Sequence, residues 1–248
     1  MEIESGPGNG AARASDVGVP AEQSVLPGHL VVPDRPLGVV LFAHGSGSDR
    51  HSPRNRAMAA VLHRARVATL LFDLLTAEET ASRANVVHVE RLAGRLVDAT
   101  RWTRGRPGLA TLPIGYFGAS TGAGAALWAA AVEGANIAAV VSRGGRPDLA
   151  ETRLGEVCAA TLLIVGGDDP VVLGHNQAAR SQLRCECRLA VIPGASHLFE
   201  EPGTLQQAAA VARDWFTGHF GVTGDARDRR GSGAFPLPRT RPRPGDRG

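Results

Sequence analysis

A serine between two glycines is the residue of this sequence best placed to act as a nucleophile. Ser120 lies in the run Gly118-Ala119-Ser120-Thr121-Gly122, which has the form G-x-S-x-G. The run follows the strand-like residues IGYFG and opens a helix-like segment, TGAGAALWAAAVE. In this strand–turn–helix setting, G-x-S-x-G projects a serine hydroxyl from a sharp turn, and the flanking glycines prevent clashes of β-carbons. The pattern therefore indicates covalent catalysis by Ser120.

A serine nucleophile needs a base, and the base needs an acid that orients it. After this kind of turn, the acid and then the base follow along the chain, each in a loop after a later strand. The run ATLLIVGGDDP contains Asp168 and Asp169, and RLAVIPGASHLFEEP places His197 just after its apolar part. Only His197, among the eight histidines, follows the acids in a loop after a strand. His197 is therefore the predicted base, and the residues alone leave Asp168 and Asp169 as alternatives for the acid.

A Gly/Ser-rich loop is the candidate for binding the negative charge that such a reaction develops. The run HGSGS at 44–48 follows the apolar run LGVVLFA, and its small residues allow backbone N–H groups to approach a substrate oxygen. We expect the N–H of Thr121 to donate one hydrogen bond to the oxyanion. We expect a second from Gly45 or Ser46. Each donor of this kind contributes roughly 3 kcal/mol of transition-state stabilisation.

Three further residues are candidates for substrate contacts. Arg54 follows the Gly/Ser loop and Arg143 lies at the end of a predicted strand, where a guanidinium can pair with a carboxylate or phosphate. His51 belongs to the same loop as Arg54 and could line the pocket. The alternative is that the arginines form internal or surface ion pairs and that the histidine is solvated. The chain contains no lysine, so arginine serves every such role.

Strand-like and helix-like segments alternate along the chain, and they must position these residues. Short apolar runs bounded by Gly or Pro are typical of strands buried on both faces, and the segments between them have helical spacing. This alternation predicts a mostly parallel sheet with helices on both faces, and a site beyond the carboxyl ends of the strands. The predicted strands are Leu37–Ala43, Val67–Leu75, Ile114–Gly118, Ile137–Ser142, Ala160–Val165 and Leu189–Ile192, and the predicted helices are Asn55–Arg66, Val86–Trp102, Thr121–Glu133, Val172–Leu183 and Leu205–Phe216.

Composition divides the 248 residues into one large domain and two flanking segments. Residues 1–24 are rich in Gly, Ala and Ser and are predicted to be flexible. Residues 221–248 are rich in Arg, Pro and Gly and are predicted to be a disordered tail, because they offer too little apolar surface to offset chain entropy. The catalytic domain is predicted at 25–220.

Charge and composition restrict the other function classes. The formal net charge is +3, but seven arginines and three acids lie from residue 221 onward, so the excess is on the tail and does not indicate nucleic-acid binding. No apolar run is long enough to cross a membrane, and the N-terminus lacks the pattern of a signal peptide, so a cytoplasmic location is expected. The three cysteines, Cys158, Cys185 and Cys187, form neither a disulfide framework nor a zinc site.

With these residues in place, residues 25–220 resemble the dienelactone hydrolase-like branch of the α/β-hydrolase superfamily. The stretches that carry the resemblance are LFAHGSGSDRHSPRN, LLFDLLT, IGYFGASTGAGAAL, VVSRGGRPDL, LLIVGGDDPVV and PGASHLFEEPGTL. The resemblance implies that the fourth position of the GG-x-D turn, Asp169, is the acid and that His197 is the base. Dienelactone hydrolase proper has a cysteine nucleophile where this sequence has Ser120, which makes dienelactone a doubtful substrate.

The resemblance implies the α/β-hydrolase fold and a serine hydrolase. Such an enzyme would cleave a carboxylic ester, thioester or lactone of a small molecule through an acyl-enzyme, with no metal or organic cofactor. Two alternatives stay open: an acyltransferase with the same three residues, and a non-catalytic binding module on this fold. Some similar proteins resemble domains fused to a phosphoribosyltransferase, but this sequence shows no pyrophosphate-binding loop of that type. The sequence does not predict the oligomeric state.

Overall fold

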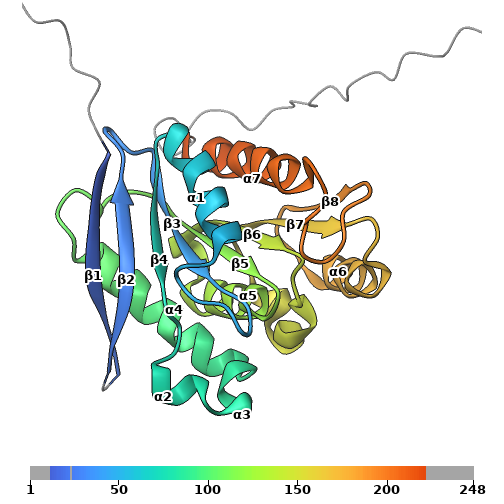
Figure 1. Cartoon of the computed structure of the whole chain (residues 1–248), viewed down its shortest axis with the longest axis horizontal. Coiled ribbons are helices and arrows are strands. Elements are labelled where there is room, and N and C mark those ends of the chain that lie inside the picture. The colour runs from blue at the N-terminus through green and yellow to red at the C-terminus, as the bar shows by residue number, and fades with distance from the viewer. Residues whose placement is uncertain (1–11, 23, 222–248) are drawn as a thin grey trace, which may run out of the picture.

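The computed structural model describes residues 12–22 and 24–221, and a central sheet of eight strands organises them (Figure 1). The strands are β1 (Arg13–Ala21), β2 (Ser24–Val32), β3 (Gly38–Ala43), β4 (Val67–Phe72), β5 (Ile114–Ala119), β6 (Ile137–Arg143), β7 (Ala160–Gly166) and β8 (Cys187–Ile192). Their order in the sheet is β1-β2-β4-β3-β5-β6-β7-β8. The six neighbouring strands β4, β3, β5, β6, β7 and β8 are parallel to one another. The remaining pairs, β1 with β2 and β2 with β4, are antiparallel.

Helices cover both faces of this sheet (Figure 1). They are α1 (Pro53–Arg64), α2 (Ala77–Thr80), α3 (Arg83–Val86), α4 (Val89–Arg104), α5 (Thr121–Glu133), α6 (Pro170–Gln182) and α7 (Thr204–Phe220), with the 3₁₀ segments η1 (Gly134–Asn136) and η2 (Pro147–Glu156). One face contacts α1 and α7, which also pack on each other; the other contacts α4 and α5, beside η2 and α6. The predicted fold class, a mostly parallel sheet between helices, is confirmed.

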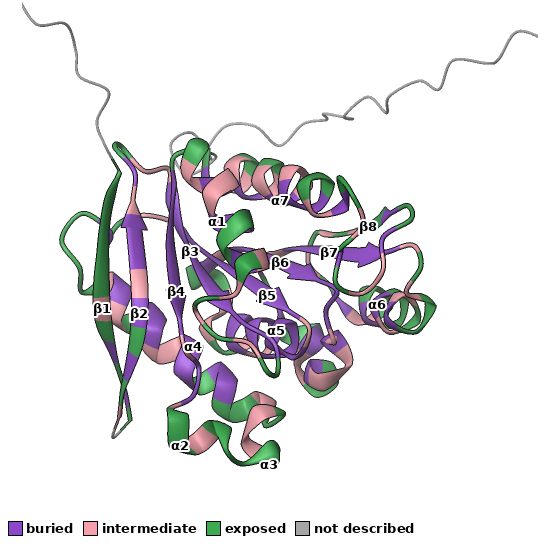
Figure 2. Cartoon of the chain, in the orientation of Figure 1, coloured by how far each residue is buried: buried purple, intermediate pink, exposed green. Residues whose placement is uncertain are grey.

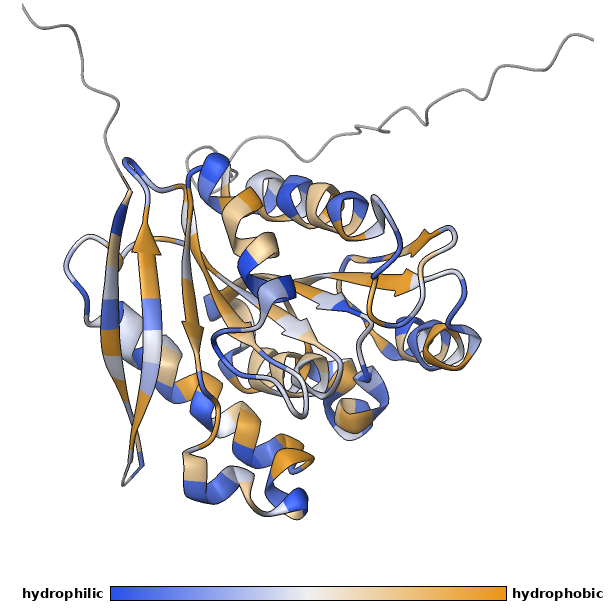
Figure 3. Cartoon of the chain, viewed as in Figure 1, coloured by the Kyte–Doolittle hydropathy of each residue, from blue (hydrophilic) through white to orange (hydrophobic). Residues whose placement is uncertain are grey.

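The core consists of two apolar layers, one on each face of the sheet. Successive side chains of a strand point to opposite faces, so Val40 and Phe42 of β3 join the layer under α1 and α7, whereas Val39 and Leu41 join the layer under α4 and α5. Every residue of β3, β4 and β5 is buried, which is why these strands read as continuous apolar runs (Figures 2 and 3).

Strand β1 corrects the prediction that residues 1–24 form a flexible segment. Arg13–Ala21 pairs along its whole length with β2. Its first residues are exposed, but Val19 and Ala21 are fully buried in the core and alternate with exposed positions. The domain therefore includes this hairpin. Residues 1–11 and the predicted tail from 222 onward lie outside the described residues.

The predicted helix Val86–Trp102 is also corrected. The chain between β4 and α4 forms two short helices, α2 and α3, and the long helix begins only at Val89. The side chain of Thr76 accepts a hydrogen bond from Glu79 N, and the Glu79 side chain accepts one from Thr76 N, a capping box that starts α2. No helix within the described ranges is long and apolar enough to span a bilayer.

Candidate active site

Ser120 occupies the sharp turn between β5 and α5. Its backbone has φ 51° and ψ −123°, a left-handed conformation that is uncommon for a residue with a side chain and costs on the order of 1–3 kcal/mol. The two flanking glycines permit the turn: a β-carbon on Gly118 would lie 2.4 Å from Cα of Ala123, and one on Gly122 would lie 2.2 Å from the carbonyl oxygen of Ala43. The strained turn directs Ser120 away from the sheet at the start of a helix.

His197 and Asp169 meet at the neighbouring strand ends. Nδ1 of His197 lies 2.7 Å from Oδ2 of Asp169. Asp169 begins α6, and its other carboxylate oxygen accepts a hydrogen bond from Val172 N at 3.3 Å. Its side chain is only 13% exposed. Asp168 is exposed, and its backbone N–H donates to Ala195 O at 3.0 Å. Of the two aspartates, Asp169 is the one that contacts His197.

The loop that carries His197 is held by hydrogen bonds at several points. Glu201 accepts a hydrogen bond from Ser196 N at 3.0 Å, which lowers the pKa of the Glu201 carboxyl. On the other side, Gly167 N donates to Ile192 O at 2.8 Å, so the turn that carries Asp169 is tied to the loop that carries His197. These bonds fix the orientation of the imidazole relative to β7 and β8.

Ser120 and His197 line one pocket with a volume of about 280 Å³. The hydrogen bonds of the described residues do not include one between Ser120 Oγ and His197, and such bonds are often long before substrate binds. The pocket is lined by Gly45, Ser46, Ser48, Ser52, Arg54, Asn55, Ala119, Ser120, Arg143, Gly144, His197 and Leu198. The predicted nucleophile, base, oxyanion loop and both arginines thus surround one cavity.

The Gly/Ser loop after β3 lies directly against Ser120. A β-carbon on Gly45 would lie 3.0 Å from Cβ of Ser120, so the backbone approaches as closely as glycine allows. Ser46 N donates a hydrogen bond to Oγ1 of Thr121 at 2.9 Å. The side chain of Thr121 therefore connects the loop to the first residue of α5. In this structure the amide of Ser46 already has a partner.

Arg143 and Arg54 both reach the pocket, but in different environments. Arg143 ends β6 and is 7% exposed, and burial, followed by repulsion from Arg54, lowers the pKa of its guanidinium to about 10. Its Nη1 is buried without a hydrogen-bond partner among the described residues. Arg54 lies at the rim, 3.5 Å from Glu200. Asn55, which the sequence did not single out, is buried beside them with its Oδ1 unpaired among the described residues.

Of the two alternatives for His51, a place in the pocket wall or a solvated ring, the described structure shows the second. The exposed ring of His51 contacts Arg56 at 2.6 Å and lines a separate surface hollow. Arg50, another residue of the same loop, is bound to the carboxylate of Asp73 through both its backbone N–H and its guanidinium. Sequence proximity to the Gly/Ser loop therefore did not predict which side chains turn toward Ser120.

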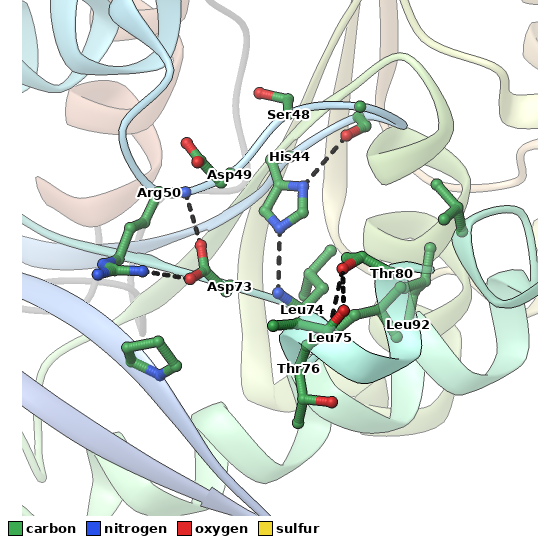
Figure 4. A pocket seen from close by; sticks show the side chains of 15 residues that line it. His44, Ser48, Asp49, Arg50, Asp73, Leu74, Leu75, Thr76, Thr80 and Leu92 are labelled. Carbon is green, nitrogen blue, oxygen red and sulfur yellow. Dashed lines mark hydrogen bonds and ion pairs between the residues drawn. The ribbon is translucent and has the colours of Figure 1, made fainter. Parts of the chain in front are cut away.

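A second, larger cavity of about 490 Å³ adjoins the first and shares Gly45 and Ser48 with it (Figure 4). His44 forms part of its wall: Nε2 accepts a hydrogen bond from Leu74 N at 3.0 Å, and Nδ1 lies 3.1 Å from Gly45 O. Burial lowers the pKa of His44, so the ring is neutral with its proton on Nδ1. Apolar side chains of Leu74, Leu75, Val86 and Leu92 line the other side.

Clusters of three or more His, Cys, Asp or Glu residues that could hold a metal ion do not occur in the described part of the chain. Of the three cysteines, Cys158 is exposed, and Cys185 and Cys187 are half-buried without a disulfide.

Solved structures share this architecture. Est1E from Butyrivibrio proteoclasticus is 15% identical, covers 83% of this chain and 99% of its own, and superposes with a TM-score of 0.72. An alpha-beta serine hydrolase homologue from Coxiella burnetii is 18% identical, with a TM-score of 0.67 over 79% of this chain and 94% of its own. At these identities the likeness concerns the fold alone, and it defines the chain as an α/β hydrolase in architecture.

A dienelactone hydrolase from Anabaena variabilis is similar in sequence as well. It is 51% identical, with a TM-score of 0.82 over 84% of this chain and 98% of its own. The chain thus belongs to the dienelactone hydrolase family of α/β hydrolases. No family model matches the sequence. A Mycobacterium tuberculosis protein named "Putative phosphoribosyl transferase" is 60% identical over 208 residues, which are 84% of this chain and 47% of that protein. The chain spans about half the length of this relative.

Proposed function

We propose that this protein is a serine hydrolase that cleaves a carboxylic ester, thioester or lactone through an acyl-enzyme intermediate. The observation that carries the proposal is the 2.7 Å contact between His197 Nδ1 and Asp169 Oδ2, with His197 and Ser120 on the walls of one pocket. The carboxylate fixes the tautomer that keeps Nε2 free to accept a proton. The family supports hydrolytic chemistry, and its members of known structure include a dienelactone hydrolase.

The reaction starts when His197 takes the proton of the Ser120 hydroxyl as the oxygen attacks the carbonyl carbon of the substrate. The bond to the leaving group breaks, and the imidazolium gives its proton to the departing alcohol, thiol or ring oxygen. A water molecule then attacks the acyl-enzyme, again with His197 as base, and releases the acid and free Ser120. Asp169 stabilises the imidazolium in both half-reactions without taking up the proton.

The oxyanion of each tetrahedral intermediate would lie between the start of α5 and the Gly/Ser loop. The N–H of Thr121 is the first donor, because the N-terminus of a helix presents free amides and a positive dipole end. Gly45 and Ser46 supply the second. The Ser46 amide is held beside the nucleophile by Thr121 Oγ1, and it can serve the oxyanion if it exchanges this hydroxyl for the substrate oxygen.

The proposal for this chain does not include the phosphoribosyl transferase activity in the name of the Mycobacterium tuberculosis relative. The chain matches 47% of that protein, whereas it accounts for 98% of the dienelactone hydrolase structure. The matched part therefore corresponds to a whole hydrolase-type domain. A phosphoribosyl transferase activity would have to belong to the part of the relative that this chain does not match.

A fluorophosphonate probe tests the proposal, because it labels only serines that are activated as nucleophiles. We expect an adduct on Ser120, located by peptide mass spectrometry, that is absent in Ser120→Ala and strongly reduced in His197→Gln. Ser181→Ala, an exposed serine of α6, is the matched control and should label like the wild type. A folded wild-type protein that does not label, or labels equally well without His197, would refute the assignment and favour a non-catalytic binding module.

Turnover separates hydrolysis from acyl transfer. Wild-type protein is incubated with p-nitrophenyl acetate, with and without an added alcohol or amine acceptor, and the products are quantified. Hydrolysis predicts free acetate as the main product at all acceptor concentrations. Transfer to the acceptor in preference to 55 M water would make the protein an acyltransferase with the same three residues.

A further inference from the structure

Asn55 is a buried amide on the wall of the pocket that contains Ser120 and His197. The residue is 3% exposed, and its Oδ1 is buried without a hydrogen-bond partner among residues 12–22 and 24–221. Its side chain forms no hydrogen bond in this part of the chain, whereas its backbone N–H donates to Ser52 Oγ at the start of α1. Buried polar side chains are nearly always hydrogen-bonded, because an unpaired group loses its hydration without compensation. The amide of Asn55 therefore has a binding capacity that the fold does not use.

Another buried asparagine shows what a role in folding looks like. Asn176 of α6 is fully buried, and its Nδ2 donates to Gly145 O at 2.9 Å and to Val172 O at 2.8 Å. Its Oδ1 is unpaired as well, but the bond to Gly145 connects α6 to the chain that follows β6. Asn176 does not line the pocket of Ser120. Asn55 lines it and makes no such connection, so its free amide lies beside a space that a ligand can enter.

The chemistry of the pocket wall decides which ligand group suits Asn55. Three serines of the same segment between β3 and α1 line the pocket with it: Ser46, Ser48 and Ser52. The two cations of the wall, Arg54 and Arg143, would repel an ammonium group. A carboxylate or an ether oxygen has no proton to donate to Oδ1 of Asn55. A neutral hydroxyl is the smallest organic group that donates to this oxygen and can accept a hydrogen bond from a serine hydroxyl at the same time.

We propose that the substrate carries a neutral hydroxyl group near its ester carbonyl, and that Asn55 binds this hydroxyl as a hydrogen-bond acceptor. The inference rests on the proposed function and narrows it to hydroxylated esters, thioesters or lactones. The pocket volume of about 280 Å³ places the hydroxyl within a few bonds of the carbon that Ser120 attacks. Asn55 is then a specificity residue, because a substrate without the hydroxyl leaves the buried acceptor unpaired and is bound less well.

Two matched series of substrates test the proposal on the wild-type protein. The first varies the acyl group: p-nitrophenyl 3-hydroxypropionate, 3-methoxypropionate and butyrate. The second varies the alcohol: 2-hydroxyethyl, 2-methoxyethyl and propyl acetate. Each kcat/KM is divided by the rate constant of the same ester with hydroxide, which removes differences in intrinsic reactivity. We expect the hydroxyl compound of one series to exceed its methyl analogue about 5- to 100-fold, because the analogue leaves a buried acceptor unpaired, and the methoxy compound to show no such gain.

Variants of Asn55 connect this preference to its amide. In Asn55→Leu, and in the smaller Asn55→Ala, the hydroxyl-to-methyl ratio should fall to within about twofold of one. Asn176→Leu is the matched control, and it should keep the wild-type ratio although it loses two hydrogen bonds. Urea unfolding gives a second readout. The midpoint should not fall in Asn55→Leu, because no side-chain hydrogen bond of the described chain is lost, but it should fall in Asn176→Leu.

A binding measurement makes the result independent of turnover. Calorimetric titration of Ser120→Ala with the six esters should show tighter binding of the hydroxyl compound in one series. That series tells whether the hydroxyl belongs to the acyl group or to the alcohol. Ser120→Ala/Asn55→Leu should bind the three esters of the series alike. Preferential binding of the hydroxyl compound without hydrolysis by the wild type would uphold the hydroxyl site and refute the proposed function.

Three outcomes would overturn the inference. The first is an equal corrected kcat/KM within each series for the wild type, together with equal binding to Ser120→Ala. The second is a gain for the methoxy compound as large as that for the hydroxyl compound, because an ether can only accept a hydrogen bond. The third is a hydroxyl preference that persists in both Asn55→Leu and Asn55→Ala, which would assign the hydroxyl to another residue. If neither hydrolysis nor binding is seen, both proposals fail.

Discussion

Replacement of Asp169 by asparagine would separate its role in catalysis from its role in folding. One carboxylate oxygen lies 2.7 Å from His197 Nδ1, and the other accepts the N–H of Val172 at the start of α6. Asparagine has the same shape and caps a helix as well as aspartate does. The cap at Val172 is therefore retained in Asp169→Asn, and the free energy of unfolding should change by less than about 1 kcal/mol.

Asp169→Asn should lower the rate of catalysis far more than it lowers the stability of the fold. The contact is charge-assisted; the Asp169 side chain is 13% exposed and the His197 side chain 40%, so solvent screens the contact in part. Loss of the charge removes about 1.5–3 kcal/mol from the stabilisation of the imidazolium. The amide can also donate to Nδ1 and so favour the tautomer whose Nε2 carries the proton and cannot act as a base. The same replacement in another serine hydrolase lowers kcat about 10⁴-fold, so we expect a loss of about 10³- to 10⁴-fold.

The assay is kcat for p-nitrophenyl acetate at pH 7.5, with urea unfolding of each variant. Asp168→Asn is the matched control, since Asp168 is exposed and is bound to the loop of His197 only through its backbone N–H. It should keep kcat within about threefold of the wild type, as surface substitutions usually do. A loss below tenfold in Asp169→Asn, or an equal loss in Asp168→Asn, would refute the assignment of the acid.

Three further predictions concern the surroundings of the site. Gly122→Ala should destabilise the protein by about 3 kcal/mol in urea unfolding, because the new β-carbon would lie 2.2 Å from a carbonyl oxygen of β3. The control is Gly174→Ala on α6, where the new β-carbon meets open space. It should stabilise the protein by about 0.5–1 kcal/mol. Thr121→Val should cost about 1 kcal/mol by removing the acceptor of Ser46 N, and Thr121→Ser should restore it. Burial lowers the pKa of His44 in the folded protein below 6.5, its ordinary value in the unfolded chain, so the unfolded chain takes up a proton first as the pH falls. The contribution of His44 to the free energy of unfolding is therefore constant above about pH 6.5. Below that pH it decreases by at most about 1.4 kcal/mol per pH unit. The free energy of unfolding of His44→Asn should change less between pH 7.5 and 5.5 than that of the wild type, and an equal change would contradict a neutral buried His44.

The sequence predicted the central strands and long helices because their signals are local. Runs such as Val67–Phe72 are buried on both faces and therefore continuously apolar. Strand β1 escaped this criterion because it is an edge strand whose apolar residues are few and small: Val19 and Ala21 are buried, and Val17 is only partly buried against the core. The short helices α2 and α3 were missed because Val86 and Val87 extend the apolar spacing of α4 beyond the point at which the chain breaks.

The choice between the two aspartates shows where local signals stop. Asp168 and Asp169 follow the same turn, and their residue types do not distinguish them. What separates them is the pairing of β7 with β8, in which Gly166 lies beside Ile192 and the turn is tied to the His197 loop by backbone hydrogen bonds. These bonds bring Asp169 to His197, a contact between residues 28 positions apart in the sequence.

The strand ends also explain why Arg143 lines the pocket of Ser120 and His51 does not. The described site is assembled from strand ends: β5 leads to Ser120, β7 to Asp169 and β8 to the loop of His197. Strand β6 lies between β5 and β7, so its carboxyl end lies between the turns of Ser120 and Asp169, and Arg143 at that end lines the pocket. His51 lies in a longer loop that leads to α1 and is free to turn outward, as it does. In a parallel sheet, position at a strand end is therefore a better indication that a residue lines this pocket than nearness in sequence to the Gly/Ser loop, and Arg143 meets that condition.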